Sequence, residues 1–353
     1  MYILPAIGSK GGLGAVCIIA LAIFGAISGA STAGMACIGT ISIPKMEENG
    51  YPRGYATALV ACAGVVGQLI PPSIPLIFYA VLTGQTIPAV WLATVGPAII
   101  VIIVYIIVNW WMSRNFPLAQ PPKLGAKAQV KASVKAIWYG LPVLFLPVLI
   151  LGGIYGGIFT PTESAAIGVF YVFIMAGLFY RNFSFKELAQ AIGTAAVTSG
   201  TIIIMVLFIL IVSRVLVVEA LPQQLASLFE AFSPNVYVTL LMVNVILLIM
   251  GMMMDDTSGT LLAATVLYPI VAHQGVNPLH FAAIVGVNLG LGNTTPPCAP
   301  CLFLAGRIGD CPAQQYMKPA FILMFSAMLP ALVVTTYWPG LSLFLPTLAG
   351  YVH

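Results

Sequence analysis

Residues 292–300 read GNTTPPCAP, and they lie inside an apolar segment that runs from about Phe281 to Ala305. The segment is long enough to cross a bilayer, but its two adjacent prolines remove backbone donors and clash with the preceding turn. Irregular backbone at membrane depth is tolerated only where protein covers it or where it lines a watery cavity. The stretch therefore predicts a broken helix with a binding site at the break, and a plain proline kink is the simpler alternative.

The composition indicates the class of protein. Hydrophobic residues make up 60% of the chain and charged residues 6%, whereas soluble domains carry about 25% charge. We therefore expect an all-α polytopic membrane protein, in which the net charge of +4 reflects loop topology and not nucleic-acid binding. The six cysteines lie in or near apolar segments and are expected to be small core residues, not a disulfide framework.

Two pairs of short apolar arms each surround a tip of small and polar residues. The first pair occupies residues 11–45 with its tip at 25–33, and the second occupies 236–270 with its tip at 251–259. Each arm is too short to cross about 30 Å of hydrocarbon. Each pair therefore predicts a re-entrant helical hairpin whose tip lies inside the membrane.

A second broken helix, at 55–84, carries the same double proline as the one at 280–309. Matching positions in the two halves of the chain are separated by a constant 225 residues, namely Pro44 and Pro269, Gly67 and Gly292, and Gly84 and Gly309. The chain is therefore predicted to contain two copies of one transport-domain repeat, at residues 11–84 and 236–309.

Residues 85–235 are predicted to connect the repeats through a span at 91–112, a polar linker at 114–135 and scaffold helices, and residues 310–353 to form a C-terminal span. The lysine-rich linker is expected in the cytoplasm. Five spans separate the hairpins, so the repeats have inverted topology, which is typical of secondary transporters. By the same symmetry the chain lacks an N-terminal block of scaffold helices: either it is a fragment or those helices come from elsewhere.

Each hairpin tip beside its broken helix predicts a shell of oxygen ligands. Unwound helix ends offer backbone carbonyls, and Ser and Thr add side-chain oxygens, which together suit an alkali cation. Several of these residues would act through their carbonyls. The predicted sodium ligands are Ser28, Ser31, Gly67, Ile70 and Pro72 in the first repeat, and Asp255, Thr257, Gly292 and Thr295 in the second.

Half-helix N-termini carry partial positive charge and free N–H groups, which suit a carboxylate. For Asp255 and Asp256, the alternative is that one of them caps the return arm of the hairpin. No metal besides sodium and no organic cofactor is expected. The predicted substrate contacts are Ser28, Gly29, Ser73, Asp255, Asp256, Asn293, Thr294 and Cys298.

These motifs resemble the large membrane subunit (DctM-like) of the TRAP transporters, the tripartite ATP-independent periplasmic systems. Three features depart from the family: Ala30 stands where Ser is usual, Cys298 replaces a smaller residue, and the N-terminal helices are absent. The stretches that carry the resemblance are Phe24–Ala33, Pro44–Tyr51, Gly64–Ile74, Gly153–Ala166, Met254–Asp255, Asn277–Phe281 and Asn288–Phe303.

The resemblance implies sodium-coupled uptake of an organic acid, such as a C4-dicarboxylate, a sialic acid or a keto acid, by an elevator mechanism. It also implies a bacterial inner membrane, a periplasmic substrate-binding protein that delivers the substrate, and a small four-helix membrane subunit. A stand-alone sodium/divalent-anion symporter is the alternative. A membrane-embedded enzyme using Asp255, Asp256 and the Cys298–Cys301 pair is disfavoured because the site elements come in symmetric pairs, so no catalytic residue is predicted.

Overall fold

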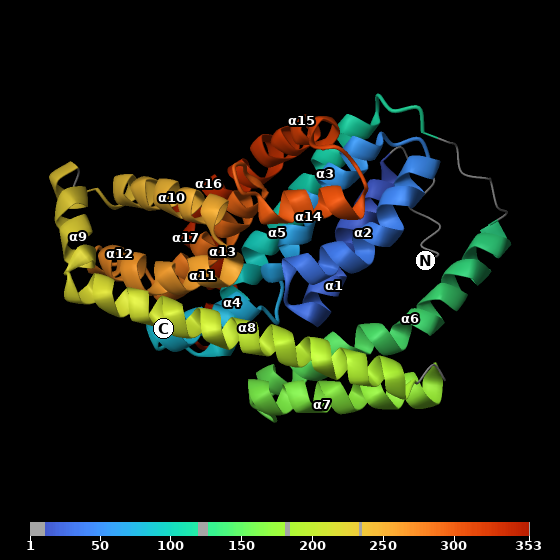
Figure 1. Ribbon diagram of the computed structural model, residues 1–353, viewed down its shortest axis with the longest axis horizontal. Helices are drawn as coiled ribbons and strands as arrows, with labels where there is room; N and C mark the ends of the chain where they lie inside the picture. The colour runs from blue at the N-terminus through green and yellow to red at the C-terminus, as the bar shows by residue number, and fades with distance from the viewer. Residues whose placement is uncertain (1–10, 119–125, 181–183, 233–234, 353) are drawn as a thin grey trace. The chain divides into compact units, whose positions relative to one another are not determined.

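The computed structural model describes residues 11–118, 126–180, 184–232 and 235–352, which form helices joined by short connections (Figure 1). They divide into two compact units. One comprises residues 1–136 and 222–353, and the other comprises residues 137–221. The first unit contains both predicted hairpins and both predicted broken helices.

Five helical segments among the described residues are long and apolar enough to cross a membrane. With the apolar composition, they make the chain an all-helical, multi-pass membrane protein, as predicted. The five segments are Ile87–Ser113, Pro161–Phe179, Phe185–Val218, Val236–Met253 and Ala313–Tyr337.

The first hairpin consists of α1 (Gly12–Ser28) and α2 (Ser31–Glu48). Only Gly29 and Ala30 interrupt the helices, so the predicted nine-residue tip at 25–33 is too long. Gly29 has φ 66, which favours glycine, and its N–H closes α1 on the carbonyl of Gly25 at 2.8 Å. Pro44 lies inside α2, and the hairpin ends at Glu48, not at residue 45.

The second hairpin consists of α10 (Val236–Met253) and a return arm built from α11 (Asp256–Leu262), the π-helical turn η4 (Ala263–Leu267) and α12 (Tyr268–His273). Its tip is Met254 and Asp255 alone, which is again shorter than predicted. The arm continues past Pro269 because η4 widens the helix just before the residue that lacks an N–H donor.

Both broken helices are present, with shorter breaks than predicted. The first is α3 (Arg53–Gly64), the 3-10 turn η2 (Val65–Gln68) and α4 (Ile74–Thr83), and the second is α13 (Pro278–Thr294) and α14 (Pro300–Ile308). Gly292, Asn293 and Thr294 thus complete the last turn of α13 instead of lying in irregular backbone. Both Pro-Pro peptide bonds in the breaks are cis.

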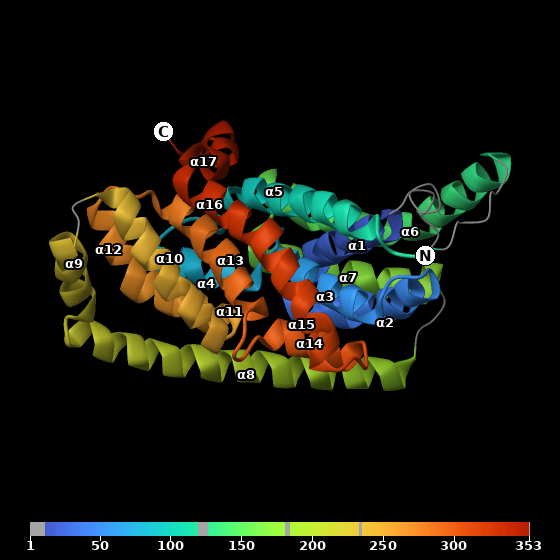
Figure 2. The same cartoon turned by 90° about the horizontal axis from the view of Figure 1, so that it is seen from above.

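The helix bounds repeat with the spacing found in the sequence. Helices α2 and α11 begin at Ser31 and Asp256, and α3 and α13 begin at Arg53 and Pro278, in each case 225 residues apart. Each half-helix that follows a break packs on the other repeat. Helix α4 of the first repeat packs on α11 and η4, and α14 of the second repeat packs on α2 and α3. In both views α10 and α11 lie beside α13 (Figures 1 and 2).

The connecting region and the C-terminus differ in part from expectation. The predicted span at 91–112 extends to α5 (Ile87–Ser113), and the predicted linker at 114–135 is wrong beyond residue 125, where α6 (Ala126–Tyr155) begins. Lys123 lies outside the described residues. The last span comprises α15 (Ala313–Leu323), η5 (Met324–Met328) and α16 (Leu329–Tyr337), and it is followed by α17 (Pro339–Leu348), which was not predicted. Helix α17 packs on α5.

The unit formed by residues 137–221 contains the end of α6, α7 (Pro161–Ile174) with η3 (Met175–Phe179), and α8 (Phe185–Val218). Helix α9 (Leu221–Phe232) follows. Thr160 and Glu163 form a capping box at the start of α7, with Thr160 N donating to Glu163 Oε2 at 2.8 Å. Tyr171 donates its hydroxyl hydrogen to the carbonyl of Pro142 at 2.8 Å and so joins α7 to α6.

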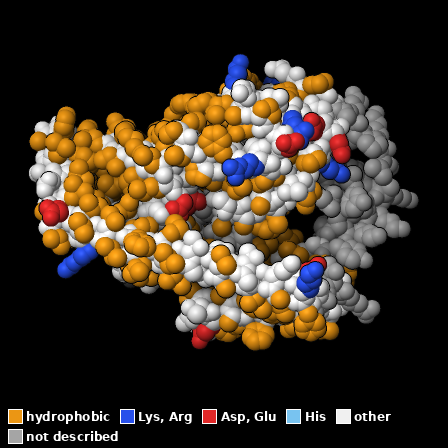
Figure 3. Space-filling model, in the orientation of Figure 1, with side chains coloured by type: hydrophobic (Ala, Val, Ile, Leu, Met, Phe, Trp, Pro, Cys, Tyr) orange, Lys and Arg blue, Asp and Glu red, His pale blue; other side chains and the backbone are white. Residues whose placement is uncertain are grey.

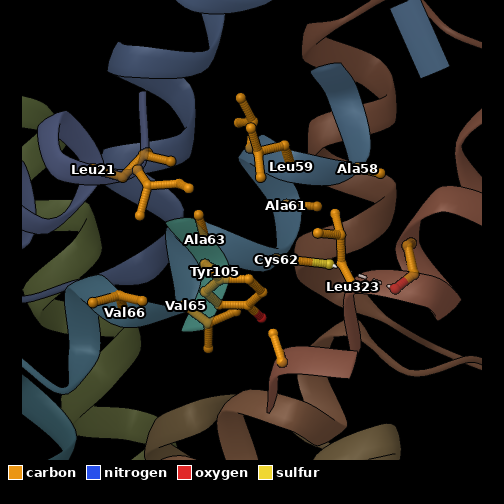
Figure 4. Close-up of a cluster of buried hydrophobic side chains, with 14 of the residues drawn as sticks. Leu21, Ala58, Leu59, Ala61, Cys62, Ala63, Val65, Val66, Tyr105 and Leu323 are labelled. Carbon is orange, nitrogen blue, oxygen red and sulfur yellow. Dashed lines mark hydrogen bonds between the residues drawn. The ribbon is translucent and has the colours of Figure 1, made fainter. Parts of the chain in front are cut away.

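The core of the larger unit surrounds α3. Leu59 and Cys62 of this helix are fully buried among side chains such as Leu21 of α1, Tyr105 of α5 and Leu323 of α15 (Figure 4). Lipid tails are as apolar as the core, so close packing of small residues holds membrane helices together. On the face shown in Figure 3, hydrophobic side chains are widespread and charged side chains are few.

Glycine pairs let the hairpins touch the broken helices. A Cβ on Gly25 would collide with the backbone of Gly67, and a Cβ on Gly292 would lie 2.6 Å from the backbone of Gly251. These two contacts join equivalent elements of the two copies, α1 to η2 and α10 to α13.

We expect Gly25→Ala to destabilise the larger unit, because overpacking of a tight contact costs about 1–3 kcal/mol. Gly200→Ala in α8 is the matched control, since no atom lies within 4 Å of its Cβ position. Heating the purified variants in detergent and following monodispersity should show an unfolding temperature lower by on the order of 5 °C for Gly25→Ala. Equal unfolding temperatures for the two variants would contradict the packing argument.

Candidate functional site

Backbone oxygens gather where the first hairpin tip meets the first break. Gly29 lies directly against the carbonyl oxygen of Pro72, and the N–H of Ile74 donates to the carbonyl of Gly29 at 3.4 Å. The carbonyl oxygen of Ala30 lies 3.6 Å from the position of a Cβ on Gly67. The structure therefore brings Gly67 and Pro72 of the predicted first sodium site close to the hairpin tip that holds Gly29, a predicted substrate contact.

The remaining predicted residues of the first junction occupy different settings. The hydroxyl of Ser28 donates to the carbonyl of Ala30 at 3.3 Å. Ser73 is buried, and its hydroxyl has no hydrogen-bond partner among the described residues. Its carbonyl accepts a hydrogen bond from Trp91 Nε1 at 3.2 Å. Ile70 is half-buried in the break. An unpartnered buried hydroxyl is costly unless it serves a ligand.

Asp255 caps α11 at the second hairpin tip. One carboxylate oxygen accepts hydrogen bonds from the backbone N–H groups of Thr257 at 3.0 Å and Ser258 at 3.4 Å. The capping role left open by the sequence is therefore the one that Asp255 takes in this structure. Thr257 contributes its backbone N–H to this cap.

Two hydroxyls at the end of α13 donate their hydrogens to one backbone carbonyl. Thr294 and Thr295 both donate their hydroxyl hydrogens to the carbonyl of Leu291, at 2.9 and 2.7 Å. A hydroxyl whose hydrogen is already donated can act only as an acceptor toward a further partner, and such an oxygen suits a cation. The carbonyl of Gly292 already accepts the N–H of Thr295 at 2.8 Å.

The two junctions meet at Asp256. Its carboxylate accepts a hydrogen bond from the Ser31 hydroxyl at 2.9 Å and another from the Asn293 side-chain amide. The side-chain amide of Gln68 also interacts favourably with this carboxylate. These four residues, Ser31, Gln68, Asp256 and Asn293, are called the central polar cluster below. The structure thus joins Ser31, a predicted sodium ligand, to Asp256 and Asn293, two predicted substrate contacts.

Gln68 was not among the predicted site residues. It donates its side-chain amide to the carbonyl of Gly286 at 3.2 Å, and its Oε1 atom is buried without a hydrogen-bond partner among the described residues. The spacing of 225 pairs Gln68 with Asn293, just as it pairs Ser31 with Asp256. Extending the repeat alignment through the break would therefore have identified Gln68.

The start of α2 lacks the cap that α11 has. Ala30 occupies the position equivalent to Asp255, and no side chain hydrogen-bonds to the first turn of α2. The first N–H groups of a helix have no partner within it and carry partial positive charge. The Asp256 carboxylate lies beside this helix start, where it accepts the hydroxyl hydrogen of Ser31.

Cys298 and Cys301 do not form a disulfide. Cys298 is exposed in the second break, whereas Cys301 is buried and its thiol lies 3.8 Å from the Ser31 hydroxyl oxygen. A search of the described residues finds no group of three or more His, Cys, Asp or Glu side chains that could hold a metal ion.

Comparison with known proteins places this chain in a family. Residues 7–341 match the family described as "Tripartite ATP-independent periplasmic transporter, DctM component". The isethionate TRAP transporter permease protein DctMQ of Oleidesulfovibrio alaskensis is 34% identical over 95% of this chain and 52% of its own length. The C4-dicarboxylate TRAP transporter large permease protein DctM of Pseudomonas aeruginosa is 33% identical over 97% of this chain and 79% of its own.

The sialic acid TRAP transporter large permease protein SiaM of Vibrio cholerae is 30% identical, again over 97% of this chain and 79% of its own length. The chain therefore spans about half the length of the isethionate protein and about four fifths of the other two. All three relatives are named as transporter permeases and not as enzymes. The chain belongs to the DctM family of large membrane components of the tripartite ATP-independent periplasmic transporters.

Proposed function

We propose that the chain imports an organic acid, that the sodium gradient drives this import, and that it acts as the large membrane subunit of a TRAP system. Relatives are named for isethionate, C4-dicarboxylates, sialic acid and 2,3-diketo-L-gulonate, all of which are organic acids. The observation that carries the proposal is the Asp256 carboxylate, held between both hairpins beside the uncapped start of α2.

This arrangement gives a physical reason for coupling. The free N–H groups at the start of α2 attract an organic anion, but the charge of Asp256 repels it. Two like charges about 6 Å apart interact with roughly 3 kcal/mol at an effective dielectric constant of about 20. A sodium ion bound beside them offsets that repulsion, so the anion binds well only together with sodium.

The oxygen atoms at the two junctions supply the proposed cation ligands. The first proposed sodium site uses the carbonyls of Pro72 and Gly67 and the hydroxyls of Ser28 and Ser31. Ile70 is its fifth proposed ligand. In the second site, Thr295 offers the lone pairs of a hydroxyl whose hydrogen is already donated. The other proposed ligands of the second site are Asp255, Thr257 and Gly292.

The proposed substrate site lies between the hairpin tips and the breaks. Gly29 and the buried, unpartnered hydroxyl of Ser73 face it from the first repeat, with Ser28 nearby. From the second repeat it involves Asp256, Asn293, Thr294 and Cys298. We assign Asp255 to the cation and not to the anion, because its carboxylate neutralises the start of α11.

The central polar cluster also supports inverted repeats that move together as an elevator. Ser31 and Asp256 occupy equivalent positions in the two copies, and they hydrogen-bond to each other. Equivalent points of two copies meet only near the axis that relates the copies. The crossed packing of α4 and α14 ties the copies into one body that can carry the site across the membrane.

The proposed partners are a periplasmic substrate-binding protein and a small four-helix membrane subunit, at a bacterial inner membrane. The family description names a three-part system. Unit 137–221 exposes large hydrophobic side chains such as Phe170, Val197 and Ile203 in the isolated chain. Such a surface offers packing area for membrane helices of a partner subunit.

The first test is uptake into proteoliposomes by the chain together with its small subunit. We expect accumulation of a labelled organic acid only with an inward sodium gradient and with the binding protein present. Uptake that is indifferent to sodium contradicts the coupling. Uptake without a binding protein supports the stand-alone symporter instead.

Asp256→Asn tests the role of the fixed charge. The amide preserves the shape of the side chain but removes the negative charge that attracts the cation, so sodium binds more weakly. We expect the sodium concentration for half-maximal uptake to rise about tenfold, equivalent to about 1.4 kcal/mol. The control is Asp310→Asn, which makes the same change at a side chain that is 99% exposed. An unchanged sodium requirement in Asp256→Asn would remove the electrostatic basis of the proposal.

Ala30→Asp tests the uncapped helix start. The new carboxylate would occupy the N–H groups of α2 as Asp255 does in α11, and it would repel the substrate. We expect the KM for the organic acid to rise at least about tenfold in uptake assays. Ala30→Asn supplies a neutral cap as the matched control, and we expect a much smaller change from it. Equal KM values for the two variants would mean that substrate does not bind at this helix start.

A further inference from the structure

A pocket of about 400 Å³ lies where α3, α5 and α15 meet, on the side of the larger unit away from the hairpin tips. We call it the α3–α5–α15 pocket. Its lining combines two cationic side chains with aromatic and aliphatic ones, and it includes Arg53, Tyr55, Met112, Phe116, Lys318 and Ile322. None of these residues belongs to the proposed transport site.

The positive charge of the pocket is only partly neutralised. Arg53 donates its Nε hydrogen to the carbonyl of Gly309 at 2.7 Å, and its two terminal nitrogens lie 3.8 and 3.9 Å from the carboxylates of Glu47 and Asp310. These long, solvent-exposed ion pairs contribute little stabilisation. Lys318 is exposed and forms no ion pair within the part of the chain that the structure describes. An anion can therefore approach both cations.

The pocket lies at the depth of the lipid headgroups. Helix α5 ends beside it, and the last turns of this helix carry Trp110 and Trp111, which are 49% and 62% exposed. Arg114 stacks on the Trp110 ring, with its guanidinium carbon 3.6 Å from the ring centroid. Exposed tryptophans with neighbouring basic residues mark the boundary between hydrocarbon and water in membrane proteins.

The apolar side of the pocket continues onto surface that faces hydrocarbon. Ile322 lines the pocket, and Phe325, one turn further along the same span, is exposed. A molecule with an anionic head and long apolar chains fits this arrangement, because its head would contact the cations and its chains would contact the exposed apolar surface.

We propose that the α3–α5–α15 pocket binds an anionic phospholipid. Its phosphate lies between Arg53 and Lys318, and its acyl chains follow Ile322 and Phe325 into the hydrocarbon. Basic pockets between helices at a membrane surface recognise headgroups in this way. Because Arg53 begins α3 and also binds the end of α14 through Gly309, the lipid would brace the junction of the two broken helices against α5 and α15.

The test is native mass spectrometry of the purified full chain, with its small subunit where the two copurify. The protein is titrated with phosphatidylglycerol or with phosphatidylcholine of the same acyl chains. We expect phosphatidylglycerol adducts at about fivefold lower lipid concentration, since one basic residue near a membrane surface contributes about that factor.

Lys318→Gln should weaken phosphatidylglycerol binding about fivefold and leave phosphatidylcholine binding unchanged. Lys45→Gln is the matched control, because Lys45 is an exposed lysine of α2 that does not line the pocket. Ile322→Trp fills the apolar side without changing charge, and it should weaken adducts of both lipids.

Three outcomes would overturn the proposal. The first is equal affinity of the wild-type chain for the two lipids. The second is an unchanged phosphatidylglycerol affinity in Lys318→Gln. The third is displacement of phosphatidylglycerol by millimolar glycerol phosphate. That result would mean that Arg53 and Lys318 bind a soluble phosphate compound and not a lipid.

Discussion

The structure depends on one contact between the two repeats, the Asp256 carboxylate that accepts hydrogen bonds from Ser31 and Asn293. A charge in this setting is costly unless it is paired or hydrogen-bonded. Its partners come from the opposite hairpin and from the end of a broken helix, so the carboxylate is satisfied only when all three elements are assembled. The same contact fixes where the two junctions meet, and so it fixes where the proposed ion and substrate sites lie.

Close packing makes that contact possible. Glycine faces glycine where α1 meets η2 and where α10 meets α13, so the backbones approach closely enough for short side chains such as Ser31 and Asn293 to reach one carboxylate. Small residues of α3 play the same part in the core. Packing and chemistry are therefore inseparable here, because larger side chains at the glycine positions would move the hydrogen-bonding groups apart.

Much of this architecture follows from sequence because prolines and glycines act locally. Pro-Pro pairs break a helix wherever they occur, and the repeated spacing located the two hairpins. The errors have a shared cause: small and polar residues such as Gly25 and Asn293 look like loop, but neighbouring helices supply enough contact to keep them helical. The packing of α17 on α5 likewise depends on tertiary structure.

The sequence predicted several residues of the candidate site but not the contacts between them. Sequence pointed to Ser31, Asp256 and Asn293, yet only the fold shows that they contact one another, since they lie on three elements far apart in the chain. Gln68 was overlooked because an amide suggests no particular chemistry by itself. The contrast between Ala30 and Asp255 also gains meaning only when the capping hydrogen bonds of α11 are seen.

The crossed packing of the half-helices has a consequence for biosynthesis. Helix α4 enters the membrane early, but its packing partners α11 and η4 are translated only after α5 and the whole of unit 137–221. Until then α4 can pack only on α5, which follows it directly in the chain. The packing of α4 is therefore completed only when the last third of the protein has been synthesised.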